Sequence, residues 1–221
     1  IYYTSKGSST SGSKAATAEE GSAEKLAGNW SKPKSVLGDG NTKYHDGPVC
    51  FTEDEGTTYF TRNNYKVQGA FNKWGKSSDN VIKLKMYEAK VNGDKWGDIK
   101  DFAYNNDEYS VGHPALSKGD SLLYFVSDMP GGYGGTDLYV CKREGSSWGS
   151  PENLGPEVNT EGDEMFPYVD SYNDLYFASD GHGGLGGLDV FKVKGSIGEW
   201  GKVKNIGSPI NSAYDDFGFV Y

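Results

Sequence analysis

Apolar and polar residues alternate along this chain in short runs that turn residues separate. The pattern is clearest near the C-terminus, where four such runs cover residues 166–169, 175–179, 188–194 and 200–206. Polar or glycine-rich segments lie between the runs, and alternation over so few residues indicates strands rather than helices. No segment keeps a helical period, so the pattern predicts an all-β fold built from antiparallel strands.

The four-run pattern repeats along the chain at a constant spacing. Leu123–Asp128 recurs as Leu175–Asp180, 52 residues later. Four tryptophans mark the repeat: Trp30, Trp96, Trp148 and Trp200. The last three are 52 residues apart, and an insertion lengthens the first interval to 66 residues. Four strands repeated at about fifty residues are typical of β-propeller blades, so we expect these tryptophans to occupy equivalent places between blades.

The repeat predicts one β-propeller domain over residues 1–221. Its four-stranded antiparallel blades are expected near residues 1–47 together with 217–221, 48–112, 113–165 and 166–216. Residues 1–5 resemble a second strand and residues 217–221 a first strand, so pairing of the two ends is expected to close the ring. An arc of a larger propeller is the alternative, and the chain is expected to come from a longer protein.

Composition and charge restrict the partners of this chain. It has 221 residues, with 31 Asp or Glu against 22 Lys or Arg and a net charge of −9. Such an acidic surface repels phosphate, so nucleic acid is not expected as a partner. No apolar run approaches the roughly 20 residues of a membrane helix, and no signal peptide is recognisable. Cys50 and Cys141 lie in strand-like runs and are expected to be small buried side chains.

Two groups of residues are candidates for binding a protein partner. The acidic group lies in the turns before first strands: Asp46, Asp163, Glu164, Asp215 and Asp216. In a propeller these turns surround one mouth of the channel, so the carboxylates either bind a basic segment or serve local turns and solubility. The aromatic group lies in the insertion at residues 62–80: Tyr65, Phe71 and Trp74.

The glycine-rich loops between second and third strands are candidate cation sites. An aspartate stands at each end of each loop: Asp128 and Asp137, then Asp180 and Asp189. Carboxylate and carbonyl oxygens are the ligands of Ca²⁺, and the same aspartates also suit turn capping. No other cofactor is expected. The three histidines adjoin no recognisable nucleophile, so the sequence predicts that the chain is not an enzyme.

The same loops carry a family resemblance. Residues 131–139 and 183–191 both follow Ser-Asp, and Asn-Leu-Gly or Asn-Ile-Gly stands at 153–155 and 205–207. This pattern resembles the WD-like, TolB-related propeller repeat of OmpA-family envelope proteins of Bacteroidota, including the PorE type that accompanies type IX secretion. The resemblance implies a protein–protein interaction scaffold in the periplasm or at the outer membrane.

Two other functions remain open at this point. One is a propeller glycan hydrolase or lyase with the acidic residues at the channel mouth. The other is a sensor that binds a cation. Neither the helical repeats nor the peptidoglycan-binding domain of the resembling family is recognisable in this chain, so the resemblance implies no cell-wall anchor for it.

Overall fold

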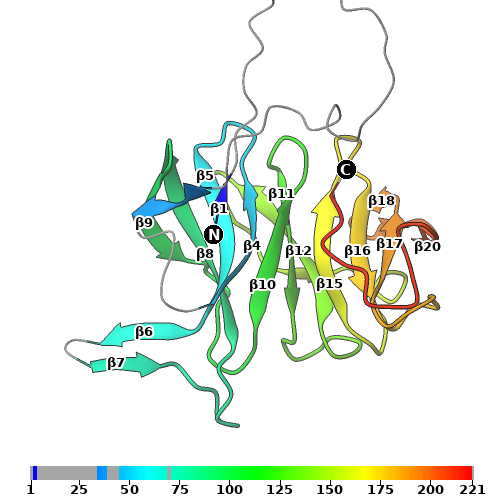
Figure 1. Cartoon of the computed structure of the whole chain (residues 1–221), viewed down its shortest axis with the longest axis horizontal. Coiled ribbons are helices and arrows are strands. Elements are labelled where there is room, and N and C mark those ends of the chain that lie inside the picture. The colour runs from blue at the N-terminus through cyan, green and yellow to red at the C-terminus, as the bar shows by residue number, and fades with distance from the viewer. Residues whose placement is uncertain (1, 4–33, 39–44, 69–70, 221) are drawn as a thin grey trace, which may run out of the picture.

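The computed structural model describes residues 2–3, 34–38, 45–68 and 71–220. Within these ranges all regular structure is strand and there is no helix (Figure 1). The prediction of an all-β fold with several antiparallel sheets is therefore confirmed. A search of the same ranges for a helix long and apolar enough to cross a membrane finds none.

The first large sheet has five strands in the order β3-β9-β8-β5-β4. Their bounds are β3 (Leu37–Gly38), β4 (Asp46–Phe51), β5 (Thr57–Asn63), β8 (Leu84–Asn92) and β9 (Lys95–Asp101). Neighbours pair antiparallel except β3, which runs parallel to β9. The insertion between β5 and β8 forms a separate hairpin that projects from the sheet, made of β6 (Tyr65–Gln68) and β7 (Phe71–Trp74) (Figure 1).

The second and third sheets share one strand plan. The second contains β10 (Val111–Leu116), β11 (Leu122–Ser127), β12 (Asp137–Glu144), β13 (Ser147–Trp148) and β14 (Glu152–Asn153). The third contains β15 (Glu164–Val169), β16 (Leu175–Ser179), β17 (Asp189–Val193) and β20 (Lys204–Asn205). Equivalent pairs keep their register, since Phe125 faces Tyr139 and Phe177 faces Phe191. The 52-residue repeat of the sequence is thus a repeat of strand pairing.

Two small two-stranded sheets complete the described structure. They are β1 (Tyr2–Tyr3) with β2 (Lys34–Ser35), and β18 (Gly195–Ser196) with β19 (Glu199–Trp200). Within the described ranges β1 pairs with β2 alone, and residues 217–220 form no strand. Pairing of the two chain ends is therefore not confirmed.

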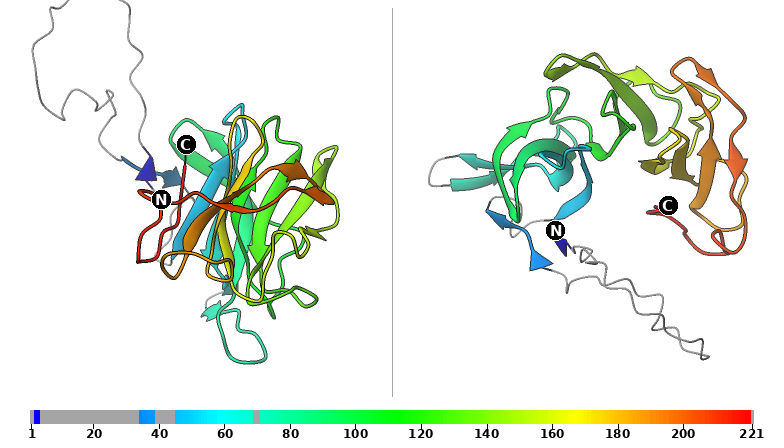
Figure 2. Two further views of the ribbon diagram at one scale, coloured as in Figure 1. Left: turned by 90° about the vertical axis from the view of Figure 1, so that its right-hand side faces the viewer. Right: turned by 90° about the horizontal axis from the view of Figure 1, so that it is seen from above.

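The three large sheets follow one another around an arc, which is clear in the view from above in Figure 2. Their first strands lie side by side on the inner side, with β10 packed between β4 and β15. Residues 217–220 return to the same inner side and lie near β15. One apolar core fills the space between the first and second sheets around Phe125, and another fills the space between the second and third sheets around Phe177.

Each first strand contains a bulge at a proline. The register with the second strand shifts between Asp46 and Val49 in β4, and likewise in β10 and β15. Pro48, Pro114 and Pro167 stand inside these shifts. A proline has no N–H for the ladder, so a bulge is the way a strand accommodates it. Pairing resumes on the N-terminal side of each bulge, and the strands begin about two residues before the predicted unit boundaries.

Candidate binding groove

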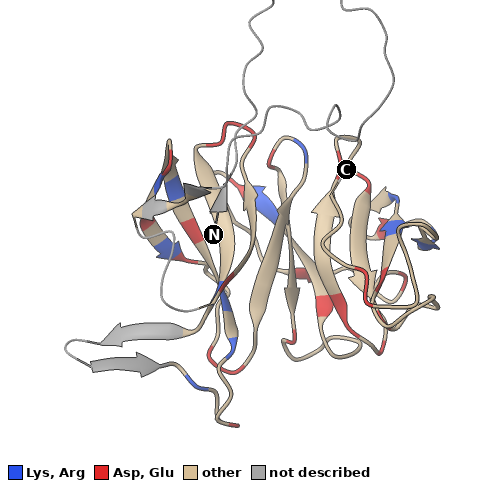
Figure 3. Ribbon diagram, viewed as in Figure 1, with Lys and Arg blue, Asp and Glu red and all other residues tan. Residues whose placement is uncertain are grey.

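An apolar groove of about 550 Å³ lies on the inner side of the arc. Its walls are residues 48–51 of β4, 113–116 of β10, 166–169 of β15, and the C-terminal residues 217–220. None of these residues is Asp, Glu, Lys or Arg, and β10 carries no charge along its length (Figure 3). A concave site with apolar walls suits an uncharged ligand group.

The bulges place two rings in this groove. His113 and Phe166 occupy equivalent positions directly before a proline, and both have a φ of 51°. This left-handed conformation is uncommon for a bulky side chain and costs on the order of 1–3 kcal/mol unless the surroundings impose it. The equivalent residue near the C-terminus is Gly218, whose φ of 70° carries no such cost.

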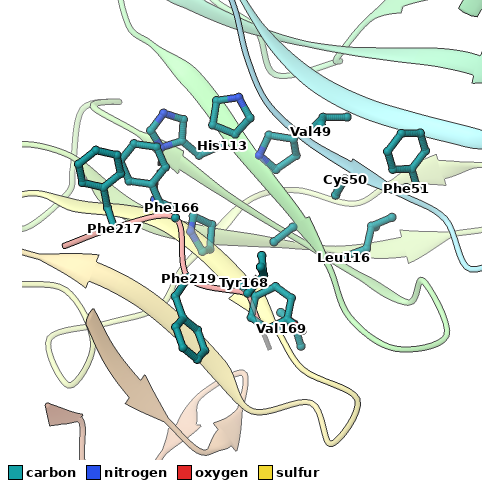
Figure 4. A pocket seen from close by; sticks show the side chains of 16 residues that line it. Val49, Cys50, Phe51, His113, Leu116, Phe166, Tyr168, Val169, Phe217 and Phe219 are labelled. Atoms are coloured by element: carbon teal, nitrogen blue, oxygen red, sulfur yellow. Dashed lines mark hydrogen bonds between the residues drawn. The ribbon is translucent and has the colours of Figure 1, made fainter. Parts of the chain in front are cut away.

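Three rings form a continuous row along one wall, which we call the ring row: His113, Phe166 and Phe217 (Figure 4). The centroids of His113 and Phe166 are 4.3 Å apart with planes at 22°, and those of Phe166 and Phe217 are 4.9 Å apart at 21°. Figure 4 shows the smaller side chains of Val49, Cys50 and Leu116 on the other side of the groove. The first strands of two sheets and the C-terminal segment thus build one stacked surface.

His113 is fixed within the row by two hydrogen bonds. Its backbone N–H donates to Oγ1 of Thr61 at 2.8 Å, and its Nδ1 accepts from the Phe166 N–H at 3.3 Å. Burial lowers the pKa of the imidazole from 6.5 to about 4, so the ring is neutral near pH 7. Because Nδ1 is the acceptor, the proton of the neutral ring lies on Nε2.

The C-terminal segment is held mainly by ring contacts. Phe219 stacks on Tyr176 with centroids 4.9 Å apart, while Phe217 packs on Phe166. Phe217 is nevertheless 56% exposed and Val220 76% exposed. This wall of the groove therefore presents apolar surface to solvent, which in a folded domain often marks a contact site.

The acidic residues of the predicted channel mouth accept hydrogen bonds from within the chain. Asp163 accepts from the N–H and hydroxyl of Thr136 at 2.8 and 2.9 Å, and Asp215 accepts from the Leu188 N–H at 3.0 Å. Each bond joins a turn to the sheet that precedes it in the chain, and we call it a clasp. Between the first and second sheets Ser110, directly before β10, takes the same place and accepts from the Leu84 N–H of β8. The carboxylates are used because these loops leave backbone donors to be satisfied.

The other three members of the acidic group are also engaged. Asp46 forms a buried ion pair with Arg62. Glu164 is fully buried and accepts from Thr160 and from the Ser179 hydroxyl, and Asp216 accepts from Ser212 at the equivalent turn. The sequence could not show that these oxygens have donors within the chain, and binding of a basic segment by this group stays a prediction.

The candidate calcium ligands fall into two structural roles. Asp128 and Asp180 accept the backbone N–H of the clasp residues Ser110 and Asp163, and Asp128 also pairs with Lys83. Asp137 and Asp189 each use Oδ2 to accept loop N–H groups, and the Oδ1 of each is buried without a hydrogen bond. One spare oxygen falls short of the six to eight that Ca²⁺ takes. In the described residues no three His, Cys, Asp or Glu side chains group as a metal site.

Two of the four marker tryptophans lie in equivalent places between sheets. Trp148 of the second sheet meets Tyr59 of the first, with centroids 5.9 Å apart, and Trp200 meets Tyr124 of the second sheet at 6.4 Å. Trp96 is buried and packs on Phe60 of its own sheet instead. Trp30 lies outside the described residues.

The remaining candidates are the aromatic residues of the insertion and the two cysteines. Tyr65 pairs with Trp74 in the register of the β6–β7 hairpin, and Phe71 begins β7. The side chains of these three residues lie outside the described part of the structure. Burial raises the pKa of the Cys50 and Cys141 thiols, which keeps them protonated. Cys141 is buried as expected, whereas Cys50 is only partly buried and lines the groove.

Comparison with known proteins finds one distant structural likeness to report. No family model and no curated protein matches the chain. Among solved structures it is similar to a puromycin-hydrolyzing peptidase of Mycobacterium tuberculosis, with 14% identity and a TM-score of 0.48. The likeness covers 84% of this chain and 25% of that chain, so this chain spans about a quarter of the peptidase.

This comparison corrects one prediction. The chain was expected not to be an enzyme, and the structural neighbour is a peptidase, so that prediction is contradicted and we withdraw it. A likeness at this identity and TM-score assigns no activity to the chain. The resemblance to OmpA-family envelope proteins stays a prediction.

Sequence reasoning missed the groove itself. No local pattern brings His113, Phe166 and Phe217 together. The usable signal was the proline repeated inside first strands at 48, 114 and 167, because proline in a strand marks an edge or a bulge. That signal places the bulges but not the rings that stack across them.

Proposed function

We propose that this chain is a docking module whose groove binds an uncharged, extended segment of a partner protein. The observation that carries the proposal is the groove wall: sixteen residues free of charged side chains, in a chain with a net charge of −9. Keeping charge away from one concave surface of an acidic protein favours an apolar ligand there. The exposed side chains of Phe217 and Val220 extend that apolar surface to solvent.

We propose further that the arc is part of a β-propeller, with the groove as its central channel. The clasp of Asp215 matches that of Asp163, which marks residues 217–220 as a first strand that lacks its second strand. Strand β1 pairs on one side with β2, as a second strand pairs with a third. Pairing of β1 with residues 217–220 would supply both missing partners, and an added sheet from a longer chain is the alternative.

The resemblance of the glycine-rich loops gives the proposal its setting. It favours a scaffold of the bacterial envelope, in the periplasm or at the outer membrane, with a protein as the partner. A rigid arc of sheets suits this role because loops and grooves on a fixed framework keep their geometry on binding.

Selection from a displayed library of random seven-residue peptides on the immobilised chain tests the docking function. Val220→Lys places a charge in the groove wall, and Val81→Lys is the matched control because Val81 is exposed (48%) and does not line the groove. We expect selected peptides to bind the wild type and Val81→Lys equally and Val220→Lys at least tenfold more weakly. Equal binding to all three proteins would place the docking site elsewhere and overturn the proposal.

Cross-linking tests the closure of the ring. A chain with Tyr3→Cys and Val220→Cys should form an intramolecular disulfide if β1 pairs with residues 217–220, because paired strands bring Cα atoms within bonding reach. A chain with Tyr3→Cys and Val81→Cys is the control and should stay reduced. Failure of the first pair to cross-link would favour the open arc.

A further inference from the structure

We infer that the groove recognises an aromatic side chain of the partner segment, which stacks on Phe217 and extends the ring row. The inference rests on the proposed docking function and names the chemistry of its ligand. Its support comes from the geometry of the row, the backbone that holds it and the polar group beside it.

The ring row is open at one end. Phe166 has a ring on each side, at 4.3 and 4.9 Å between centroids, whereas Phe217 has one ring neighbour among the described residues and is 56% exposed. Aromatic rings at such separations gain energy beyond the area they bury. A fourth ring stacked on Phe217 would form the same kind of ring contact that His113 forms with Phe166 and Phe166 forms with Phe217.

The left-handed backbone that positions the row costs conformational free energy. A surface that is merely apolar does not require such a conformation. His113 and Phe166 both adopt φ of 51°, although an aliphatic wall needs no left-handed residue. Left-handed bulky residues concentrate at sites where a side chain must take one direction. Here the direction is the one that brings two rings from neighbouring sheets nearly parallel, at 22°.

A polar donor lies at the end of the row opposite Phe217. The Nδ1 of His113 accepts from Phe166, so the neutral imidazole keeps a proton on Nε2, and no described residue accepts it. An extended segment that runs along the row carries a carbonyl at every residue, and a carbonyl a few residues from the aromatic side chain is the acceptor that suits Nε2–H. The ligand that fits is therefore an aromatic residue within an extended, uncharged segment.

The test uses three acetylated and amidated tripeptides of sequence Gly-X-Gly, with X as Phe, Leu or Lys. Binding is followed by NMR shifts of labelled wild-type protein at His113, Phe166 and Phe217. We expect the Phe peptide to bind about three- to tenfold more tightly than the Leu peptide, the gain that ring stacking brings. The Lys peptide should produce no shift, because nothing in the groove pairs with its charge.

Two Phe→Leu variants, one in the ring row and one elsewhere in the groove, distinguish the contribution of the row from that of the groove as a whole. Phe217→Leu removes the terminal ring and should abolish the preference for Phe over Leu. Phe51→Leu removes another ring that lines the groove at 41% exposure but contacts Trp96 rather than the row, so the preference should remain. Phe166→Gly removes the middle ring and should abolish the preference for the Phe peptide over the Leu peptide. Because glycine adopts a left-handed φ without strain, the loss of stability should not exceed that caused by removing a half-buried ring.

The outcomes distinguish this inference from the function on which it rests. Equal binding of the Phe and Leu peptides, or an unchanged preference in Phe217→Leu, overturns the aromatic site and leaves the docking groove standing. The absence of any shift at the three row residues with all three peptides also overturns it. The docking function falls only if the library selection fails as well.

Discussion

The second and third sheets are built on one plan but end in different surfaces. At equivalent positions, Val140 is buried in the core between the two sheets, whereas Lys192 bonds the Tyr176 hydroxyl at 2.6 Å and Asp174 at 2.7 Å. Contact with Lys192 lowers the pKa of Asp174, which strengthens the pair. The face covered by a following sheet is apolar, and the same face of the last large sheet is polar.

A second equivalent pair shows the same contrast. Val158 is fully buried beneath the third sheet, and Ile210, 52 residues later, is 45% exposed. The strand pairing around them is unchanged. The repeat therefore fixes the backbone of each unit, while the neighbour determines which of its side chains become core.

The largest expected effect on stability comes from replacing Val140 of the second sheet by lysine, the residue at the equivalent position of the third sheet. Val140→Lys should lower the free energy of unfolding by about 3–5 kcal/mol, because the ammonium would be buried without a partner. Urea unfolding followed by tryptophan fluorescence measures it.

The reverse change, Lys192→Val, should cost only about 1 kcal/mol, since Lys194 also reaches Asp174 at 3.2 Å and the site is partly solvated. Losses of equal size in the two variants would show that the two faces do not differ as described.

The next effect concerns the carboxylates at the start of equivalent first strands. Glu164→Gln should cost about 1–3 kcal/mol, because an amide replaces a fully buried acceptor that faces Thr160 and Ser179. Asp216→Asn should cost about half as much, since Asp216 is only partly buried and accepts from Ser212 alone. Thermal melts of both variants give the ratio, and a larger loss for Asp216→Asn would contradict the assignment.

The third effect is a pH dependence that His113 contributes to the second sheet and that Phe166, at the equivalent position of the third sheet, does not. The pKa of His113 is lowered to about 4 in the folded state, so the unfolded state binds the proton first as pH falls. Stability should drop by about 2 kcal/mol between pH 7 and pH 5 through this residue. His113→Phe, which copies the residue of the third sheet, should remove that part of the slope. An identical pH profile in the variant would place the titration elsewhere.

The smallest effect compares the two tryptophan contacts. The Trp148 indole N–H donates to the Tyr59 hydroxyl at 3.2 Å, whereas the Trp200 indole N–H is buried without an acceptor. Tyr59→Phe should therefore cost about 1 kcal/mol. Tyr124→Phe, at the equivalent place beside Trp200, should change stability by less than about 0.5 kcal/mol. Equal costs would show that the hydrogen bond contributes nothing.

Strand positions were predictable from the sequence because they depend on local alternation. The second strand expected at residues 175–179 is β16, and the third expected at 188–194 contains β17. The predicted fourth strand was less accurate: residues 200–206 divide between the end of β19, which pairs with β18, and β20, which pairs with β17. Turns formed by a few residues leave a clear local signal, and a change of pairing partner does not.

The candidate site was not predictable in the same way, because its residues meet only through tertiary structure. Asp163 and Thr136 are 27 residues apart, and nothing local marks the aspartate as an acceptor for that loop. The ring row joins His113, Phe166 and Phe217 from three successive units. A repeated sequence predicts the strands within each unit. The contacts between units depend on the tertiary structure and cannot be predicted from the repeat.

The clasps have a consequence for how this molecule folds and grows. Two clasps satisfy a donor of one sheet with an acceptor from the next, as Leu84 with Ser110 and Thr136 with Asp163. The third joins Leu188 to Asp215 of the segment that follows the third sheet. Such an array behaves as a line of coupled units, in which a single 52-residue unit is unstable alone and order spreads from neighbour to neighbour. Partial unfolding should then begin at the terminal units, and the array can lengthen only by whole repeats.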